Sequence, residues 1–401
     1  MKRISFLAAS LTGVLLLPGA APRVEKLDLF AAGSEGYALY RIPGIIATAR
    51  GTLLAYCEAR KGERGDWGTI DILLRRSTDK GKTWQPRRKI AEVTGPHSKN
   101  PAALAQNLAS PEDRTYNNPV AIAGRDGTVH FLFCLEYMRA FYLRSDDDGL
   151  TWTKPVEITA TFEQFRDDYP WKVLATGPGH GIQLKSGRLL VPVWLSTGTG
   201  GHAHRPSVVS TVYSDDGGKT WQRGTIAVPN TPQWVNPSES TAVELADGRV
   251  MLNARSESGA HRRLITYSRD GVTGWTPPIF HDQLLEPICM AGMAGVSAGK
   301  KGQRLLLFSN PHNLERKGAT AEPGMPRDRK NLAVKLSYDE GNTWPVSRVL
   351  EPGFAGYSDL AAGPDGWIYC FFERGGTGDN HFRSTYLTLA KFNLEWLGGG
   401  R

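Results

Sequence analysis

The sequence predicts an all-β protein, a six-bladed β-propeller, from three observations. A box of the form Ser-x-Asp-x-Gly-x-Thr-Trp, here called the Asp box, recurs along the chain. Glycine turns recur six times at comparable intervals. Runs rich in β-forming residues flank several of these turns and have turn residues at both ends. Repeats of this length are typical of four-stranded sheets arranged around a central axis.

The Asp box is present in four complete copies and one decayed copy. Successive copies begin 68, 69, 54 and 69 residues apart, about the length of one four-stranded sheet with its loops. Asp and Gly favour a tight turn, and Trp can pack into the sheet, so the box is interpreted as structural. A tryptophan platform for sugars is the alternative, which the regular spacing disfavours. The copies span 77–84, 145–152, 214–221, 268–275 and 337–344.

The glycine turns support the count of six blades independently of the boxes. Strands are expected over 189–195, 249–253 and 304–308. The last blade lacks a box, so residues 24–30 are expected to supply the strand that closes the ring. The six turns contain Gly51, Gly127, Gly187, Gly248, Gly302 and Gly366.

The domain organisation predicted is a signal peptide over 1–21 followed by one propeller domain over 22–401. Lys2 and Arg3 precede a short apolar stretch that ends in small residues. The stretch is shorter than the roughly 20 residues of a membrane span. We therefore expect a secreted or periplasmic protein without stable membrane insertion, an uncleaved anchor being the alternative.

Charge and cysteine content narrow the possible partners. The formal net charge of +8 is compatible with nucleic acid, a membrane surface or an acidic small substrate, and the scattered basic residues disfavour only the nucleic acid. The cysteines lie far apart without metal-binding spacing, so buried free thiols on strands are favoured over disulfides or metal ligands. We expect no cofactor, and we expect the protein to be a monomer. The four are Cys57, Cys134, Cys289 and Cys370.

Four motifs depart from the repeat and carry a resemblance. Arg41 opens an Arg-Ile-Pro motif, Asp66 lies in Gly-Asp-Trp, residues 177–184 read GPGHGIQL, and Tyr357 stands in GYSDL. With these motifs the chain resembles the bacterial and animal exo-α-sialidases (neuraminidases) with Asp-box, or BNR, repeats, of glycoside hydrolase family 33 type. The resemblance covers essentially everything after the signal peptide.

The resemblance implies that Arg41, Arg255 and Arg329 bind the carboxylate of the substrate. The planar guanidinium fork pairs with a carboxylate through two hydrogen bonds and keeps its charge. Each arginine alone would be read as a surface ion pair, and their joint spacing favours the triad. Arg327 is an alternative to Arg329 in a different alignment.

The resemblance also implies that Tyr357 is the nucleophile and Glu239 the base that takes its proton. Sialidases are a known exception among glycosidases in using tyrosine, so this role comes from the family. A carboxylate nucleophile would be repelled by the carboxylate of the sugar. An unperturbed phenol, with a pKa of about 10, needs such a base at neutral pH.

Asp66 resembles the general acid and base that protonates the leaving oxygen and then activates water. A turn-forming aspartate in Gly-Asp-Trp is the structural alternative. Only its position, 11 residues before the first Asp box, favours the catalytic role. Asp71 is the competing acid, which strand alternation makes less suitable.

Supporting residues follow from the same resemblance. Glu373 is expected to orient Arg41, with a solvent-facing glutamate as the alternative. Arg60 is expected to support the site, and His180 to shape the pocket without acting as an acid or base. Further candidates for the acyl or glycerol side of the pocket are Asn117, Asn118, Tyr137 and Trp171.

The predicted function is a retaining exo-α-sialidase that hydrolyses terminal sialic acid of glycans, glycoproteins or glycolipids through a covalent tyrosyl intermediate. One alternative is a glycosidase or trans-glycosidase for a related 2-keto acid sugar. Another is a non-catalytic Asp-box propeller that binds acidic glycans, because fold alone does not establish activity. A binding protein would need the arginines but not the pair of Tyr357 and Glu239.

Overall fold

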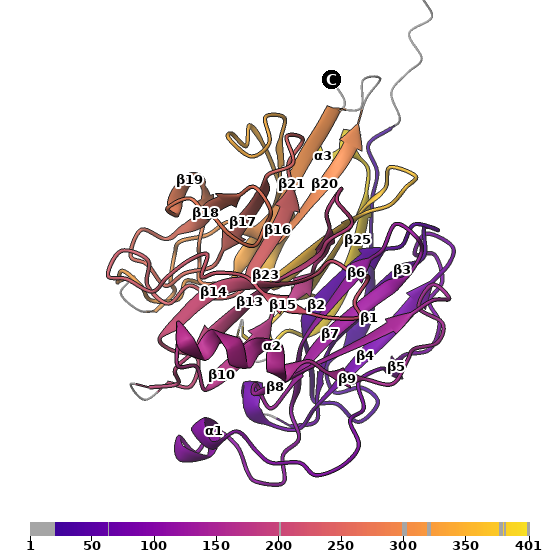
Figure 1. The fold of residues 1–401 in the computed structure, drawn as a ribbon. Coiled ribbons are helices and arrows are strands. Elements are labelled where there is room, and N and C mark those ends of the chain that lie inside the picture. Colours follow the sequence, from indigo (N-terminus) through magenta and orange to yellow (C-terminus); the bar gives the residue numbers. More distant parts are fainter. Residues whose placement is uncertain are drawn as a thin grey trace, which may run out of the picture.

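The computed structural model describes residues 21–62, 64–199, 202–298, 303–318, 322–376, 380 and 382–398. The expected signal peptide, apart from its last residue, lies outside the described residues. Nearly all the regular structure is β-strand, and Figure 1 shows the strands gathered into sheets with a few short helices at their edges. The predicted all-β class is therefore confirmed.

The first two sheets come from the N-terminal half of the chain. The first has the order β2-β3-β4-β5 and the second β11-β6-β7-β8-β9. The first contains β2 (Leu39–Ala47), β3 (Leu53–Arg60), β4 (Ile70–Ser77) and β5 (Arg88–Lys89). The second contains β6 (Tyr116–Ala123), β7 (Val129–Leu135), β8 (Arg139–Ser145), β9 (Val156–Glu157) and β11 (Gly179–His180).

The next two sheets follow in chain order. Their orders are β10-β13-β14-β15, with β12 also paired to β13, and β16-β17-β18-β19. The third sheet contains β10 (Val173–Thr176), β12 (Ile182–Gln183), β13 (Leu189–Ser196), β14 (Ser207–Ser214) and β15 (Gln222–Arg223). The fourth contains β16 (Ser240–Glu244), β17 (Val250–Ala254), β18 (Arg262–Ser268) and β19 (Ile279–Leu285).

The last sheet has seven strands in the order β1-β25-β24-β23-β22-β21-β20. Its long strand β23 pairs with β22 through its first half and with β24 through its second half. N-terminal β1 pairs antiparallel with the last strand, as expected for residues 24–30 (Figure 1). The strands are β1 (Val24–Ala31), β20 (Gly292–Ala298), β21 (Gln303–Pro311), β22 (Lys330–Ser337), β23 (Val346–Ala362), β24 (Ile368–Arg374) and β25 (Tyr386–Phe392).

Helices are short and peripheral in the described chain. None of the three α-helices exceeds five residues, so helix packing contributes little to the core. In that part of the chain, no helix has the length and apolarity needed to cross a membrane. The helices are α1 (Pro101–Ala105), α2 (Thr159–Glu163), α3 (Leu394–Leu397) and the 3-10 helices η1 (Gly65–Trp67) and η2 (Gln164–Asp167).

The hydrophobic core is divided into layers between sheets that follow one another in the chain. One cluster joins Leu54 of β3 to Phe131 of β7, and the next joins Leu132 of β7 to Val191 of β13. A further cluster joins the first sheet to the last strands of the chain through contacts that include Leu53. Each sheet thus buries both faces, because alternate side chains of a strand point to opposite sides.

The Asp boxes are turns held by the same hydrogen bonds in each copy. In the second box, Asp147 accepts hydrogen bonds from the Ser145 hydroxyl at 2.8 Å, the Thr151 backbone N–H at 2.7 Å and the Thr151 hydroxyl at 2.6 Å. Asp216 and Asp339 repeat this pattern in their own boxes. The structural interpretation of the box is confirmed.

All four cysteines are buried free thiols. Cys57, Cys134 and Cys370 lie on strands, as expected. Cys289 does not, because it lies in the connection between β19 and β20, where it packs beside Tyr357. Its placement on a strand was wrong.

We predict that Asp147→Ala destabilises the protein by about 1–3 kcal/mol, because three hydrogen bonds to a carboxylate are lost. Burial opposes ionisation, but hydrogen bonds from Thr151 and Ser145 lower the pKa of Asp147 to about 2. The stabilisation is therefore present above the unfolded-state pKa of about 3.9 and disappears as the pH falls through about 2. Thermal or denaturant unfolding at pH 7 and pH 3 measures it.

The matched control is Asp146→Ala, one residue earlier. Asp146 makes an exposed ion pair with Arg144 at 3.3 Å, and its side chain is 59% exposed. Such pairs contribute little to stability. Equal destabilisation by the two substitutions would contradict the structural role of the box.

Candidate active site

Strand ends from several sheets meet at one cavity of about 200 Å³. The first, fourth and last sheets each contribute polar side chains to it, although these residues are far apart in the sequence. All six residues predicted to bind or react with the substrate line this cavity. They are Arg41, Asp66, Glu239, Arg255, Arg329 and Tyr357.

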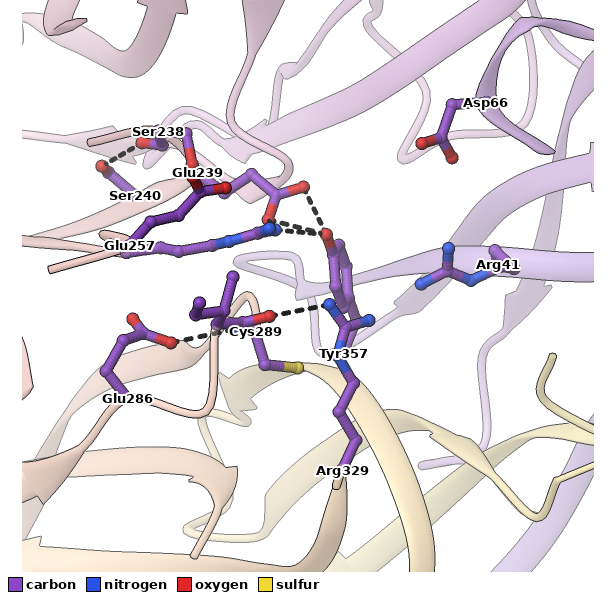
Figure 2. A network of polar contacts seen from close by, with 12 residues as sticks. Arg41, Asp66, Ser238, Glu239, Ser240, Glu257, Glu286, Cys289, Arg329 and Tyr357 are labelled. Atoms are coloured by element: carbon purple, nitrogen blue, oxygen red, sulfur yellow. Dashed lines mark hydrogen bonds and ion pairs between the residues drawn. The ribbon is translucent and has the colours of Figure 1, made fainter. Parts of the chain in front are cut away.

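The Tyr357 hydroxyl lies at the centre of a buried hydrogen-bond network. It donates to the Glu239 carboxylate, whose oxygens are 2.6 and 2.7 Å away, and accepts from an Arg255 N–H at 2.7 Å. Arg255 also pairs with Glu239 directly. Figure 2 shows this carboxylate joined to the phenol, with Arg41 and Asp66 across the cavity. Nucleophile-type and base-type groups are thus within hydrogen-bond reach.

A β-hairpin explains the 16-residue spacing of Glu239 and Arg255. Glu239 directly precedes β16 and Arg255 directly follows β17, and these strands pair antiparallel. The ladder extends beyond the strand ends, because the Arg255 N–H donates to the Glu239 carbonyl at 3.0 Å. The two side chains therefore stand side by side at the same end of the sheet.

Glu373 of β24 is the buried anchor of this region. Its carboxylate accepts two hydrogen bonds from the Arg41 guanidinium, at 2.9 and 3.2 Å. It also accepts from the backbone N–H groups of Ile42, at 3.2 Å, and Tyr357, at 3.1 Å. One carboxylate thus holds both the arginine and the backbone that carries the phenol. The alternative of a solvent-facing glutamate is wrong, because Glu373 is only 2% exposed.

Three guanidinium groups surround the Tyr357 ring. Those of Arg41 and Arg329 each lie 5.0 Å from the ring centroid, and Arg255 contacts the hydroxyl. Arg329 is fixed by donating to the Ile288 carbonyl at 2.7 Å. Burial raises the pKa of the Tyr357 phenol above its ordinary value, although the arginines oppose that effect. The phenol is therefore protonated at neutral pH, and the surrounding positive charge favours an anionic ligand.

Backbone irregularities position these side chains. The pairing register of β2 shifts between Arg41 and Gly44, and Ile42 takes a φ of 58°. A β-branched residue rarely adopts this conformation, so the deviation marks a bulge that redirects Arg41. The register of β23 likewise shifts between Ala355 and Ser358, around Tyr357. Such bulges recur beside functional sites.

Asp66 lies on η1, on the other side of the cavity. Arg60, at the end of β3, donates to its carboxylate at 2.7 Å and also bonds buried Glu58 at 2.8 Å. The Asp66 side chain is 40% exposed. Partial desolvation opposes the shift, but the charge of Arg60, assisted by that of Arg41, holds the pKa of Asp66 below its usual value. In the ligand-free protein this carboxyl is therefore ionised.

The competing candidates lie elsewhere. Asp71 is on β4, where it accepts from the Tyr37 hydroxyl at 2.7 Å and does not line the cavity. Arg327 donates to the backbone carbonyls of Glu322 and Met325, whereas Arg329 lines the cavity. The structure thus favours Asp66 and Arg329 over both alternatives.

His180 requires a correction. It lines a second cavity, of about 430 Å³, and its Nδ1 lies 2.7 Å from an Asp359 carboxylate oxygen. Parallel pairing of β11 with β6 places it there. The expectation that His180 shapes the pocket around Tyr357 is therefore wrong.

Only two of the four residues predicted for the acyl or glycerol side of the pocket line the cavity. Asn118 and Tyr137 line the cavity, but Asn117 does not, and Trp171 lies in the core between the second and third sheets. The placement of Asn117 and Trp171 in the pocket was wrong. The Asn117 amide lies in an irregular part of β6, where it accepts from the Tyr137 N–H at 3.2 Å and donates to Asn118 at 3.0 Å.

Several lining residues were missed by the sequence interpretation. Trp194, His204 and Ser207 line one wall, and Arg205 pairs there with Glu257 at 2.6 Å. They come from β13, β14 and the connection between them. No motif marked them, because the connection belongs to no repeat. Among the described residues there is no group of three His, Cys, Asp or Glu side chains that could hold a metal ion.

The chain is similar in sequence to proteins named as sialidases. The chain is 31% identical over 407 residues to a sialidase of Micromonospora viridifaciens and 32% identical over 349 residues to a sialidase of Bacteroides fragilis. The alignments cover 98% and 82% of this chain but only 57% and 59% of those relatives. The chain therefore spans less than two thirds of the length of these curated relatives.

A solved structure is similar along most of the chain. A Hadza microbial sialidase matches with a TM-score of 0.72 and 27% identity, covering 92% of this chain and 68% of that one. The family model described as the BNR repeat-like domain matches residues 51–370, which include the Asp boxes. The chain therefore belongs to the BNR repeat-like domain family, and its similar proteins are sialidases.

Proposed function

We propose that this protein is a retaining exo-α-sialidase that removes terminal sialic acid from glycans, glycoproteins or glycolipids through a covalent tyrosyl intermediate. The observation that carries the proposal is the buried Tyr357 hydroxyl, bonded to Glu239 and Arg255 beneath two further guanidinium groups. The activity named for the relatives supports it. A protein that only bound acidic glycans would not need a phenol bonded to a buried carboxylate.

Substrate binding would begin with the sugar carboxylate. Arg41, Arg255 and Arg329 place fixed positive charge around Tyr357. A carboxylate attached to the anomeric carbon would pair with these guanidinium groups. That pairing brings the anomeric carbon next to the phenol oxygen, which is the orientation that attack requires.

In the first chemical step, the Tyr357 oxygen attacks the anomeric carbon and the glycosidic carbon–oxygen bond breaks. Glu239 takes the phenolic proton, and protonated Asp66 gives its proton to the leaving oxygen. A neutral phenol avoids the repulsion that a carboxylate nucleophile would meet from the sugar carboxylate. The sugar is left bonded to the tyrosine.

In the second step, water attacks the same carbon and the bond to the Tyr357 oxygen breaks. Asp66 takes a proton from the water, and Glu239 returns its proton to the phenolate. Two inversions at the anomeric carbon give net retention. Both carboxyl groups then have their initial protonation states.

The protonation of Asp66 links binding to chemistry. The charges of Arg60 and Arg41 lower its pKa in the free protein. A bound sugar carboxylate would offset the charge of Arg41 and exclude water, and both effects raise the pKa of a neighbouring acid. Substrate binding thus favours the protonated form of Asp66, which can then give its proton to the leaving group.

We further propose that residues 22–401 form a single six-bladed propeller domain. The seven-stranded sheet would count as two blades, because β23 pairs with β22 in its first half and with β24 in its second. The core clusters between successive sheets support this division.

We also propose that the protein is exported to the periplasm or the medium and acts as a monomer. The composition of residues 1–21 supports export.

We predict that Tyr357→Phe lowers kcat on a fluorogenic α-sialoside more than about a thousandfold, since loss of a nucleophile has effects of that size or larger. Wild-type protein treated with 2,3-difluorosialic acid should gain one sugar mass on the peptide that contains Tyr357. Kinetics and peptide mass spectrometry measure these outcomes. Full activity of the variant, or labelling of another residue, would exclude this nucleophile.

We predict that the effect of Asp66→Asn depends on the leaving group. For sialyl-lactose, whose leaving oxygen needs a proton, kcat should fall about 10²–10⁴-fold. For an aryl sialoside with an acidic phenol the loss should be much smaller. Asp71→Asn, at the competing acid outside the cavity, is the control. Equal losses on both substrates would argue against general acid catalysis by Asp66.

We predict that Glu373→Gln raises KM about tenfold or more with a smaller change in kcat, because Arg41 loses its charged partner. Affinity for a carboxylate-bearing inhibitor should fall in parallel. Glu244→Gln is the matched control, since Glu244 is also buried and accepts a backbone N–H but lines the second cavity. A purely structural role for Glu373 would reduce active protein without changing KM.

A further inference from the structure

Arg329 is held in a different way from the other two arginines of the cavity. Arg41 and Arg255 each pair with a carboxylate. Among the residues that the structure describes, Arg329 has no carboxylate partner, and the one hydrogen bond of its guanidinium runs to the Ile288 carbonyl, at 2.7 Å. The direction of this guanidinium therefore depends on what holds a single backbone carbonyl in place.

Ile288 lies in the connection between β19 and β20, in a strained conformation. Its φ is 66°, in the left-handed region, and its side chain is buried. Only one other β-branched residue of the described chain has such a φ, namely Ile42 beside Arg41. A β-branched residue keeps this conformation only where its surroundings impose it. Neighbouring groups must therefore hold the turn around Ile288.

A buried ion pair holds this turn. Glu286 accepts a hydrogen bond from the Cys289 backbone N–H at 2.8 Å, and Arg263 donates to the Cys289 carbonyl at 3.0 Å. Arg263 also donates to Glu286 at 2.6 Å, and both side chains are 0% exposed. The residue after Ile288 is thus fixed through both of its backbone groups. This pair is called the Arg263–Glu286 clamp, and Figure 2 shows Glu286 bonded to Cys289 close to Arg329.

The clamp is anchored in the fourth sheet. Arg263, on β18, donates to the Asn253 side-chain oxygen at 2.6 Å and to the Asn253 carbonyl at 3.1 Å, on the neighbouring strand β17. Its planar guanidinium makes these bonds together with those to the turn, which the single ammonium group of a lysine could not do. Arg255 follows Asn253 by two residues. The sheet that positions Arg255 therefore also sets the position of the turn that holds Arg329.

Net stability does not explain a fully buried ion pair. Taking two charges out of water costs about as much free energy as their attraction returns, so apolar side chains often stabilise a fold equally well. The surroundings of Glu373 have a similar arrangement, because its carboxylate accepts a hydrogen bond from the Ile42 N–H. In both places a buried carboxylate holds the backbone at or next to a left-handed isoleucine, which in turn adjoins an arginine of the cavity. This correspondence indicates that the clamp serves the site.

We propose that the clamp positions Arg329, by way of the Ile288 carbonyl, to bind the carboxylate of the substrate. The inference rests on the proposed sialidase function, in which that carboxylate binds to Arg329. Arg263 and Glu286 do not line the cavity, so they act as positioning residues and do not touch the substrate. Without the clamp, the turn can relax toward an ordinary backbone conformation, and the Ile288 carbonyl then no longer directs the guanidinium.

The test measures, by titration calorimetry, the dissociation constants of 2-deoxy-2,3-didehydrosialic acid and of its carboxamide, which has an uncharged amide in place of the carboxylate. Wild-type protein should bind the acid about 100-fold more tightly than the amide, because hydrogen bonds between charged groups are the stronger ones. Glu286→Gln and Arg263→Lys should each bring this ratio about 3- to 10-fold closer to one, because Arg329 is no longer directed at the carboxylate. A loss of folded protein lowers the amount of ligand bound without changing the ratio.

A double-mutant cycle tests whether the clamp acts through Arg329. Arg329→Ala should lower the ratio by itself. Adding Glu286→Gln to Arg329→Ala should cause no further fall, because the side chain that the clamp positions is already absent. A general structural role of the clamp would lower the ratio equally whether or not Arg329 is present.

Asp148→Asn is the matched control. Asp148 is also buried and pairs with an arginine, Arg76, but it belongs to an Asp box and does not line the cavity. This variant should keep the wild-type ratio. An unchanged ratio in Glu286→Gln and Arg263→Lys, or a further fall in the Arg329→Ala background, would overturn the inference. Equal binding of the acid and the amide by wild-type protein would instead refute the carboxylate-binding role on which the proposed function depends.

Discussion

The Glu373 carboxylate is the interaction on which the site depends. It accepts hydrogen bonds from the Arg41 guanidinium and from the backbone N–H groups of Ile42 on β2 and Tyr357 on β23. The first of these strands comes from the N-terminal sheet and the second from the C-terminal one. A buried carboxylate with four donors is stable only if all of them are in place. Glu373 thereby links an N-terminal strand, which carries the anion-binding Arg41, to a C-terminal strand, which carries the nucleophile Tyr357.

The repeated architecture supplies the rigidity that this arrangement requires. Each Asp box ties its turn with hydrogen bonds to one carboxylate, and each interface between successive sheets has its own apolar cluster. The turns of the Asp boxes can therefore remain regular while bulges at Ile42 and around Tyr357 distort β2 and β23. Arg41 and Tyr357 lie on strands, Glu239, Arg255 and Arg329 lie directly beside strand ends, and Asp66 lies on η1.

Much of the fold and the centre of the site could be predicted. The boxes and glycine turns predicted the strands, because turn chemistry is local. The placement of Tyr357, Glu239 and the three arginines followed from motifs that resemble a family. The prediction for His180 was wrong, because the glycine-rich motif around it does not show which of the two cavities its side chain lines. Trp194, His204 and Ser207 were missed as lining residues, because no sequence motif marks them and only the folded chain brings them to one cavity.

The sequence by itself determined that this is a repeated β-protein and which residue types could carry acid, base, nucleophile and anion-binding roles. It did so because turns, strand patterns and short motifs depend on neighbours in the chain. Only the tertiary structure decided that Glu373 is a buried anchor and that Arg60 holds Asp66 ionised in the free protein. These properties arise from burial and from charges brought together from distant segments, which no local pattern contains.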